Sequence, residues 1–273
     1  MNFDLTIIGG GSAGFSAAIK ADELQADTLL INDDAVGLGG TCVNAGCLPT
    51  KHLLHVGAII HNARRTGSRG LHASVSFDFK EITKGKDEVV GKLRRIKYEE
   101  VLKGLSRVEY VEGSAKLLSE KRVRVNGETY GTDRVIVATG SSTFIPPVKG
   151  INDVNYLTNK EALKLEDKPD SIIILGGGPL GVEFAQMFSR FGIKIYLFQQ
   201  AERIVIREEP ELTGLLQRYL MEEGIEIYTK VEVKEAEERG ERKIVKAVID
   251  GKLEIFEGDQ LLLATGRRAN TLN

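Results

Sequence analysis

Residues 3–14 read Phe-Asp-Leu-Thr-Ile-Ile-Gly-Gly-Gly-Ser-Ala-Gly, and this stretch decides the fold. Its apolar start is typical of a buried parallel strand. Gly9, Gly11 and Gly14 follow, and the segment after them has the periodicity of a helix. In such a strand–turn–helix unit the first glycine allows a tight turn and the second lets the backbone approach a pyrophosphate. The third lets the helix pack on the strand.

The same pattern returns in the second half of the chain. Residues 171–181 read Ser-Ile-Ile-Ile-Leu-Gly-Gly-Gly-Pro-Leu-Gly, with Gly176, Gly178 and Gly181 in the corresponding places. A lone fingerprint of this kind also occurs in unrelated glycine-rich turns. Two copies in the same context indicate two bound dinucleotides, most simply a flavin and a nicotinamide. In each half a later strand is followed by Ala-Thr-Gly, so the order of strands, glycine turn and helix in the first half is repeated in the second.

We therefore predict an α/β protein with two Rossmann-like dinucleotide-binding domains of the three-layer ββα/βαβ type. One domain is expected over residues 1–149 and the other over residues 150–273; the family resemblance given below implies that the first is the FAD-binding domain and the second the NAD(P)-binding domain. Pro146, Pro147 and Gly150 are typical of a linker, and Asn126-Gly127 predicts a hairpin turn. Strands are predicted at residues 3–8, 28–31, 134–138, 171–175, 193–198, 225–229 and 260–264. Short β-rich runs are predicted at residues 108–137, 231–236, 244–249 and 253–256. Helices are predicted at residues 13–24, 50–65, 79–105, 180–191 and 209–223.

Composition excludes several classes of protein. The chain has 273 residues, of which 42% are hydrophobic and 28% charged, with 37 basic residues against 39 acidic ones. These values argue against a disulfide-stapled mini-protein, a disordered tail, a coiled coil and a nucleic-acid-binding protein. No apolar run is long enough to span a bilayer and no signal peptide is recognisable, so we expect a cytoplasmic protein without a membrane partner.

The residue that binds ribose is usually acidic, and here it is not a simple carboxylate. At the end of the second strand Asn32 occupies that position, with Asp33 and Asp34 beside it. Asn32 can hydrogen-bond a hydroxyl, and Asp33 could replace it.

In the second copy the corresponding strand ends in Gln199-Gln200. No carboxylate there favours the 2′-hydroxyl of NADH or repels a 2′-phosphate. Arg203 and Arg207 follow closely, so the sequence favours NADPH and leaves NADH open.

Residues 39–51 read Gly-Gly-Thr-Cys-Val-Asn-Ala-Gly-Cys-Leu-Pro-Thr-Lys and contain both cysteines, Cys42 and Cys47. Their spacing is not that of zinc knuckles, and His52 and His55 are more often helix-surface or core residues than ligands. We expect no structural metal site. A disulfide closing so short a loop stabilises little. A redox pair at a helix start, where the dipole favours the thiolate, therefore explains the segment better than a structural disulfide or two buried thiols.

Taken together, both fingerprints, the cysteine segment, Glu183 and the two Ala-Thr-Gly segments resemble the flavin-dependent pyridine nucleotide–disulfide oxidoreductases along the whole chain. Val43 and the segment Arg207-Glu208-Glu209-Pro210 resemble the mercuric reductases of that family; the dihydrolipoamide dehydrogenase type is the alternative. The resemblance implies an enzyme that passes electrons from NAD(P)H through FAD to a Cys42–Cys47 disulfide and on to a small-molecule or metal-ion substrate, here Hg(II). A catalytically silent nucleotide-binding fragment is the alternative from another class.

The resemblance also implies roles for single residues. Cys47 would lie nearest the flavin, Cys42 would exchange with substrate or bind Hg(II), and Lys51 would pair with Glu183 beside the flavin ring. FAD would contact Gly9, Gly11, Ser12, Ala13, Gly14, Asn32, Asp33, Gly40, Thr41, Lys51, Ala115, Ala138, Thr139 and Gly140. The pyridine nucleotide would contact Gly176, Gly178, Pro179, Leu180, Gly181, Gln199, Gln200 and Gly266.

The chain departs from the family in three ways. Members continue past the second Ala-Thr-Gly with a Gly-Asp segment and a dimerisation domain that carries a His–Glu pair, and mercuric reductases end in a further cysteine pair. This chain stops at Asn273, so we expect a truncated form with an incomplete flavin domain, and a homodimer only for the full-length form. Pro179 stands where many members have an aromatic residue, and Ala269 where proline is common.

Overall fold

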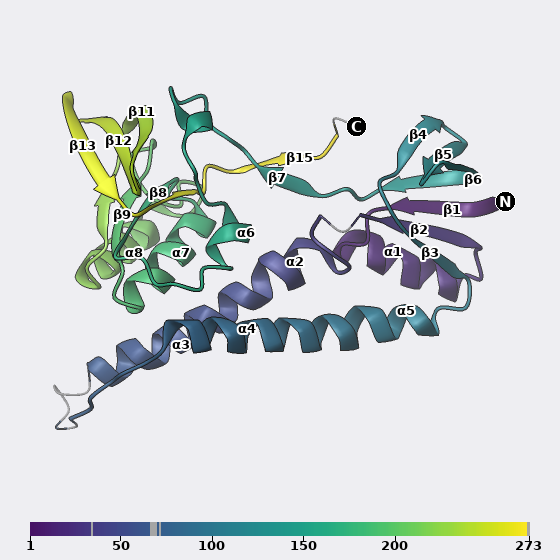
Figure 1. The fold of residues 1–273 in the computed structure, drawn as a ribbon, viewed down its shortest axis with the longest axis horizontal. Helices are drawn as coiled ribbons and strands as arrows, with labels where there is room; N and C mark the ends of the chain where they lie inside the picture. The colour runs from purple at the N-terminus through teal and green to yellow at the C-terminus, as the bar shows by residue number, and fades with distance from the viewer. Residues whose placement is uncertain (34, 66–69, 71, 272–273) are drawn as a thin grey trace. The chain divides into compact units, whose positions relative to one another are not determined.

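The computed structural model (Figure 1) describes residues 1–33, 35–65, 70 and 72–271. The chain divides into two compact units. The first comprises Met1–Pro49, Asp87–Ser142 and Arg268–Asn273, and the second comprises Thr50–Lys86 and Thr143–Arg267. Each unit contains a parallel sheet with helices, which confirms the predicted α/β class.

The first unit is built on a six-stranded sheet with the order β3-β2-β1-β6-β5-β4. The strands β3, β2, β1 and β6 run parallel, and β5 and β4 extend the edge in the antiparallel direction. Asn126 and Gly127 join β5 to β6 with φ of 51° and 85°, as the Asn-Gly signal predicts. The strands are β1 (Asn2–Ile8), β2 (Thr28–Asn32), β3 (Val108–Glu112), β4 (Lys116–Ser119), β5 (Arg122–Val125) and β6 (Glu128–Val137).

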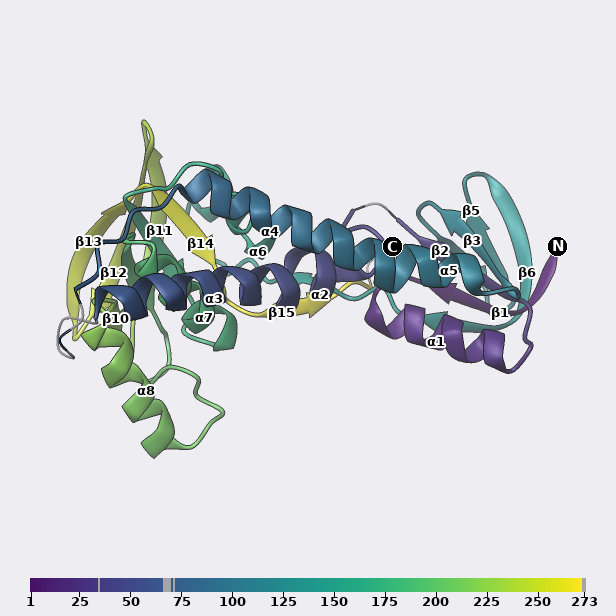
Figure 2. The ribbon, with the colours of Figure 1, turned by 90° about the horizontal axis from the view of Figure 1, so that it is seen from below.

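Helix α1 (Ser12–Glu23) lies against one face of this sheet (Figure 2). Its buried residues Phe15 and Ala18 pack with Ile7 of β1 and Leu30 of β2. This contact places the N-terminus of α1 directly after the end of β1, which is the arrangement that the first glycine fingerprint requires.

The cysteine segment forms two consecutive helices, α2 (Gly40–Ala45) and α3 (Cys47–Arg64). The sequence predicted a helix from residue 50, but α3 begins at Cys47 because Pro49 fits within a first helical turn, where its missing N–H is not needed. The helix predicted over residues 79–105 is interrupted. It consists of α4 (Phe79–Arg94), a π-helical turn η2 (Arg95–Glu99) and α5 (Glu100–Gly104).

The second unit contains a four-stranded parallel sheet with the order β10-β9-β8-β14 and an antiparallel meander β11-β12-β13. Every residue of β8 is buried, as expected for the central strand of a parallel sheet. The strands are β8 (Ser171–Leu175), β9 (Lys194–Phe198), β10 (Glu226–Tyr228), β11 (Glu232–Arg239), β12 (Arg242–Ile249), β13 (Lys252–Gly258) and β14 (Gln260–Leu263). The helices are η3 (Ile151–Asp153), α6 (Asn159–Ala162), α7 (Pro179–Arg190) and α8 (Pro210–Glu222).

The compact units differ from the predicted division at residue 150. The chain passes between the units at four places, after residues 49, 86, 142 and 267. The last two lie within the paired strands β7 (Ser141–Thr143) and β15 (Arg267–Ala269). The segment Thr50–Lys86 groups with the second half because Leu53, Ile60 and Phe79 belong to the core around Phe184 and Phe188 of α7. The predicted linker at Pro146 and Pro147 therefore lies inside the second unit.

Candidate functional site

The first glycine turn joins β1 to α1. Gly9 has a φ of 111°, and a Cβ atom there would lie 2.3 Å from the carbonyl oxygen of Ala138. A Cβ on Gly14 would lie 1.8 Å from the carbonyl oxygen of Gly9. These two positions therefore require glycine for folding. Gly11 is different, since its nearest neighbour would be the Cα of Gly40 at 3.7 Å, so the backbone there is open to a ligand.

The second glycine turn repeats this geometry between β8 and α7. Gly176 has a φ of 109°, and a Cβ would lie 2.4 Å from the carbonyl oxygen of Ala264; on Gly181 it would lie 1.9 Å from that of Gly176. Nothing lies within 4 Å of a Cβ built on Gly178. In both turns the glycine directly before the helix, Gly11 or Gly178, is thus the one at which a Cβ would meet no atom closer than 3.7 Å.

In each turn the residue predicted to bind ribose has an amide side chain, and this amide hydrogen-bonds the backbone of the turn. Asn32 Oδ1 accepts a hydrogen bond from the Gly10 N–H at 2.7 Å, and Gln199 Oε1 accepts one from the Gly177 N–H at 3.1 Å. Their NH₂ groups donate to the carbonyl oxygens of Asp33 and Arg203. Both amides are therefore engaged within the turn.

The remaining predicted ribose residues lie on the surface. Asp33 is exposed and its Oδ1 accepts a hydrogen bond from the Ala35 N–H at 3.2 Å. Gln200 is also exposed, and Asp34 lies outside the described residues. Asp33 and Gln200 are thus free to reach a ligand in a way that the two turn amides are not.

Arg203 and Arg207, predicted to favour NADPH, have different surroundings. The Arg203 guanidinium donates to the carbonyl oxygens of Ile206 at 2.9 Å and Glu208 at 3.1 Å, so it stabilises its own loop. Arg207 is exposed. The structure thus leaves Arg207 as the guanidinium better placed to meet a ligand.

The predicted FAD residues after β6 are fixed by an asparagine that the sequence analysis did not single out. Thr139 Oγ1 donates to the Asn270 carbonyl oxygen at 2.7 Å, and Asn270 Nδ2 donates to the Thr139 carbonyl oxygen at 2.9 Å. The Asn270 N–H also donates to the Gly140 carbonyl oxygen at 3.0 Å. Its position just after the second Ala-Thr-Gly segment is the only signal in the sequence.

The other predicted nucleotide residues occupy the two units as follows. In the first unit Ser12 and Ala13 are exposed at the N-terminus of α1, and Ala115 packs against the core after β3. In the second unit Pro179 is the exposed first residue of α7, Leu180 packs against the core, and Gly266 is exposed with a φ of 111°.

The cysteine pair lies beside the first glycine turn. Gly40, with a φ of 64°, comes so close to Gly11 that a Cβ would lie 2.7 Å from the Gly11 Cα, which brings the start of α2 and Thr41 against the turn. Cys42 of α2 is half-buried, Cys47 at the start of α3 is exposed, and both are free thiols.

The two thiols interact with each other. Partial burial, and then the hydrogen bond with Cys47, raise the pKa of the Cys42 thiol above its ordinary value, and the positive charge of Lys97 acts in the opposite direction. In this dithiol form the neutral Cys42 thiol is therefore favoured more than in a free cysteine.

Lys51 and Glu183 form an ion pair within the second unit, as the resemblance implied. Lys51 is on α3 and Glu183 is on α7, and their side chains are 62% and 38% exposed. An ion pair this open to water adds little stability.

In the part of the chain that the structure describes, no helix is long and apolar enough to cross a membrane. No three histidine, cysteine, aspartate or glutamate side chains come together there as a metal-binding group.

The family model for pyridine nucleotide-disulphide oxidoreductases matches residues 3–273. The chain belongs to this family. Pyridine nucleotide-disulphide oxidoreductases depend on FAD and NAD(P)H, and the two glycine turns and the dithiol are the features of this chain that correspond to that chemistry.

Three similar proteins illustrate the relationship within this oxidoreductase family. A mercuric reductase of Lysinibacillus sphaericus is 37% identical over 99% of this chain and 49% of its own length. A dihydrolipoyl dehydrogenase of Acholeplasma laidlawii is 35% identical over 98% of this chain and 80% of its own length. The HOCl-induced flavoprotein disulfide reductase RclA of Escherichia coli, solved as a Cu(II) complex, has a TM-score of 0.86 at 27% identity over 99% of this chain and 58% of its own. The chain thus spans about half the length of the mercuric reductase.

Proposed function

We propose that this chain provides the nucleotide-binding and dithiol machinery of an NAD(P)H-dependent flavin disulfide oxidoreductase of the mercuric reductase type. The observation that carries the proposal is the Cys42–Cys47 dithiol, whose two sulfurs interact beside the uncovered Gly11 of the first glycine turn. A dithiol with a purely structural role would not require the first glycine turn to pack against α2.

The residues of the first turn fit the FAD that the family uses. Gly11 leaves the backbone open, and the exposed Ser12 and Ala13 begin α1, so their N–H groups and the helix dipole would hold the pyrophosphate. Thr139 and Gly140, fixed by Asn270, would contact the same cofactor. When bound, FAD would supply the two-electron link between NAD(P)H and the cysteine pair.

The cysteine pair would act as a two-electron store. Two free thiols lose two protons and two electrons when the Cys42–Cys47 disulfide forms, and a disulfide substrate that accepts those electrons becomes two thiols. Hg(II) would be bound as substrate by the same sulfurs, because thiolates are soft ligands, and each thiol would release its proton on binding.

The second turn would hold the pyridine nucleotide. Gly178 is uncovered at the N-terminus of α7, and Lys51 and Glu183 form the ion pair on α3 and α7 within the same unit. Arg207 is the guanidinium that would contact a 2′-phosphate, which supports NADPH over NADH.

A dihydrolipoyl dehydrogenase-type activity is the second candidate. It is favoured by the 35% identity to the Acholeplasma laidlawii protein, of which the chain covers 80%. Val43 and the segment from Arg207 to Pro210 instead resemble mercuric reductases.

The test is reconstitution of the chain with FAD followed by NADPH oxidation assays with Hg(II) or with lipoamide. Faster turnover with Hg(II), lost in Cys42→Ser and in Cys47→Ser, supports the proposal, and faster turnover with lipoamide supports the second candidate. Binding of NADPH without oxidation by any acceptor, including a dye, would show instead a catalytically silent nucleotide-binding module.

A further inference from the structure

Helix α8 has an apolar face that the second unit covers only in part. Leu220 is buried and Leu216 packs against the core of this unit. Beside them Leu212, Leu215 and Tyr219 are 65%, 39% and 51% exposed, and their i, i+3, i+7 spacing places them on one face of the helix. We call these three residues the α8 stripe. Figure 2 shows α8 at the border of the second unit.

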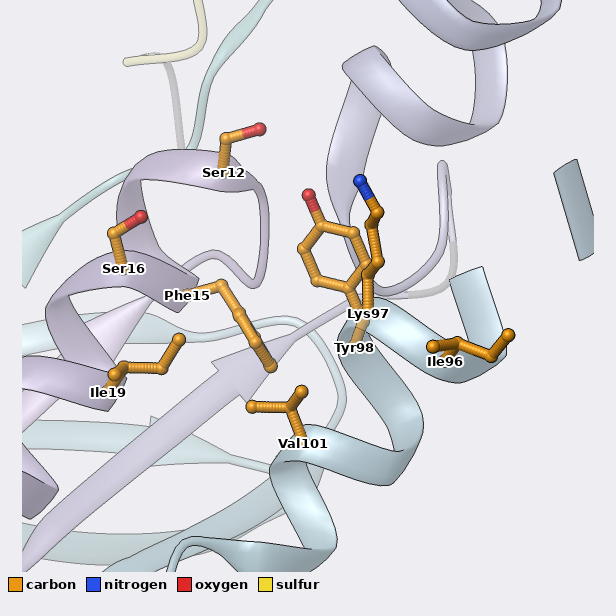
Figure 3. Close-up of a pocket in the computed structure, with 8 residues that line it drawn as sticks. All are labelled: Ser12, Phe15, Ser16, Ile19, Ile96, Lys97, Tyr98 and Val101. Carbon is orange, nitrogen blue, oxygen red and sulfur yellow. The ribbon is translucent and has the colours of Figure 1, made fainter. Parts of the chain in front are cut away.

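The apolar residues of α1 have different surroundings. Phe15 and Ile19 lie opposite Tyr98 and Val101, and the four side chains line one pocket (Figure 3). The Phe15 and Tyr98 rings are 4.8 Å apart, so the segment 96–101 covers the apolar face of α1. The exposed fractions of the α8 stripe show that no described segment covers α8 in this way.

Two charged residues, Glu211 and Arg218, lie on the same side of the α8 stripe. Each directly precedes a stripe residue in the sequence, and both are exposed. They are about 10 Å apart along the helix axis, which is too far for them to pair within one helix. Among the described residues neither forms an ion pair, and the Arg218 guanidinium lies 5.6 Å from the centre of the Tyr219 ring. Both charges are therefore available to a partner.

This pattern is complementary to itself when two copies of α8 run antiparallel. Leu215 then meets Leu215 of the second copy near the two-fold axis, and Leu212 meets Tyr219 of the second copy. Side chains on the same flank face each other in an antiparallel pair, so Glu211 meets Arg218 of the second copy, and the axis repeats this contact. A parallel pair would place residues of the same number at the same height and leave both charges unpaired.

We propose that the α8 stripe is the contact surface for a second copy of this chain, which packs its own α8 against it in the antiparallel direction. The dimer removes the exposed apolar side chains of both copies from water, and the two ion pairs at the rim set the direction of the helices. Two-fold dimers are the commonest protein oligomers. The stripe contains no residue of the glycine turns or the cysteine pair, so this proposal is independent of the proposed function.

The association is measured by sedimentation equilibrium of the full chain. One helix face on each copy is a small interface, so we expect a dissociation constant between about 10 µM and 1 mM. The mass should rise from 29.9 kDa toward twice that value as the concentration passes through this range.

A lysine in the α8 stripe tests the apolar contact. Leu215→Lys brings like charges together at the two-fold axis and should weaken the dimer by about tenfold or more. Leu253→Lys, the same substitution at a leucine of β13 that is 62% exposed, is the matched control and should leave the association unchanged. Circular dichroism checks that each variant is folded, and Leu212→Lys repeats the test at the most exposed stripe residue.

Reversal of the charges tests the direction of the helices. Glu211→Arg or Arg218→Glu alone brings like charges together on both sides of the axis and should weaken the dimer about tenfold. The double variant Glu211→Arg/Arg218→Glu exchanges the two charges and should restore the dissociation constant to within about twofold.

Three results would overturn the proposal. The first is a mass of 29.9 kDa at every concentration up to about 1 mM, which would show that a second copy does not bind. The second is a folded Leu215→Lys or Leu212→Lys variant that dimerises as tightly as the unsubstituted chain. The third is a double charge variant that stays as weak as the single ones, or single variants without effect, because either would exclude the antiparallel pair.

Discussion

Gln199 holds the second glycine turn, since its Oε1 accepts a hydrogen bond from the Gly177 N–H at 3.1 Å. Asn32 and Gly10 make the same contact in the first turn at 2.7 Å. In each half an amide at the end of the second strand ties down the middle glycine, which gives a structural reason for the missing carboxylate. An amide can accept from the turn and donate to a neighbouring carbonyl at once, and a carboxylate cannot.

The Gln199 contact predicts a measurable stability difference. Gln199→Leu leaves the buried Gly177 N–H without its partner, so the free energy of unfolding should fall by about 1–3 kcal/mol. Gln200→Leu, at the exposed neighbour, should change it by less than about 0.5 kcal/mol. Urea unfolding of both variants measures the difference. Equal stability of the two would show that the contact contributes nothing.

The glycines of the second turn predict a separation of folding from binding. Gly181→Ala forces a Cβ to 1.9 Å from the Gly176 carbonyl oxygen and should destabilise the chain by about 3 kcal/mol or more. Gly178→Ala meets nothing within 4 Å, so its stability should be unchanged while its methyl group keeps the pyrophosphate away. We expect about tenfold weaker NADPH binding by calorimetry for Gly178→Ala. If Gly178→Ala binds NADPH as tightly as the unsubstituted chain, the nucleotide does not bind at this turn.

Arg207 predicts which nucleotide is preferred. Arg207→Gln removes the exposed guanidinium proposed to contact the 2′-phosphate and should weaken NADPH binding by about tenfold without affecting NADH. Arg218→Gln, on α8, is the control with the same charge change. A parallel loss of affinity for both nucleotides, or for neither, would count against the assignment to NADPH.

Glu223 predicts part of the acid sensitivity of the second unit. Its carboxylate is 10% exposed and forms a bidentate pair with Arg190, with both contacts at 2.8 Å. Burial raises the pKa of Glu223, but the hydrogen bonds and charge of Arg190 outweigh burial and leave that pKa below its ordinary value. A lowered pKa in the folded state stabilises the fold above the unfolded value of about 4.3, and this stabilisation is lost as the pH falls through the folded value.

Glu223→Gln should therefore cost about 3–5 kcal/mol at pH 7, because Arg190 is left buried without its partner. The difference from the unsubstituted chain should shrink below about pH 4. Thermal unfolding between pH 7 and pH 3 measures both effects, and Glu222→Gln at the exposed neighbour should have little effect at either pH. If the stability difference between Glu223→Gln and the unsubstituted chain is the same at pH 7 and pH 3, Glu223 does not contribute to the acid sensitivity of the second unit.

The elements predicted correctly are those whose signals are local. The apolar strand before Gly9, its repeat before Gly176 and the Asn126-Gly127 turn each depend on a few adjacent residues, and all three lie where the sequence placed them. The Lys51–Glu183 pair was predicted only through the resemblance to a family, because 132 residues separate the two.

What the sequence could not show depends on distant packing. The segment Thr50–Lys86 joins the second unit through Leu53 and Ile60, which share a core with Phe184 and Phe188, more than a hundred residues away. Asn270 fixes Thr139 across 131 residues. The π-helical turn at Arg95–Glu99 interrupts a stretch whose charged, periodic pattern continues without a visible break.

The most direct test of the central claim is a count of cysteine thiols before and after reduction by NADPH. The chain is oxidised, loaded with FAD, given one equivalent of NADPH without oxygen, alkylated with iodoacetamide and mapped by mass spectrometry. We predict that Cys42 and Cys47 are both unmodified before NADPH and both alkylated afterwards, in proportion to the NADPH consumed. NADPH oxidised while the Cys42–Cys47 disulfide stays intact would contradict the account.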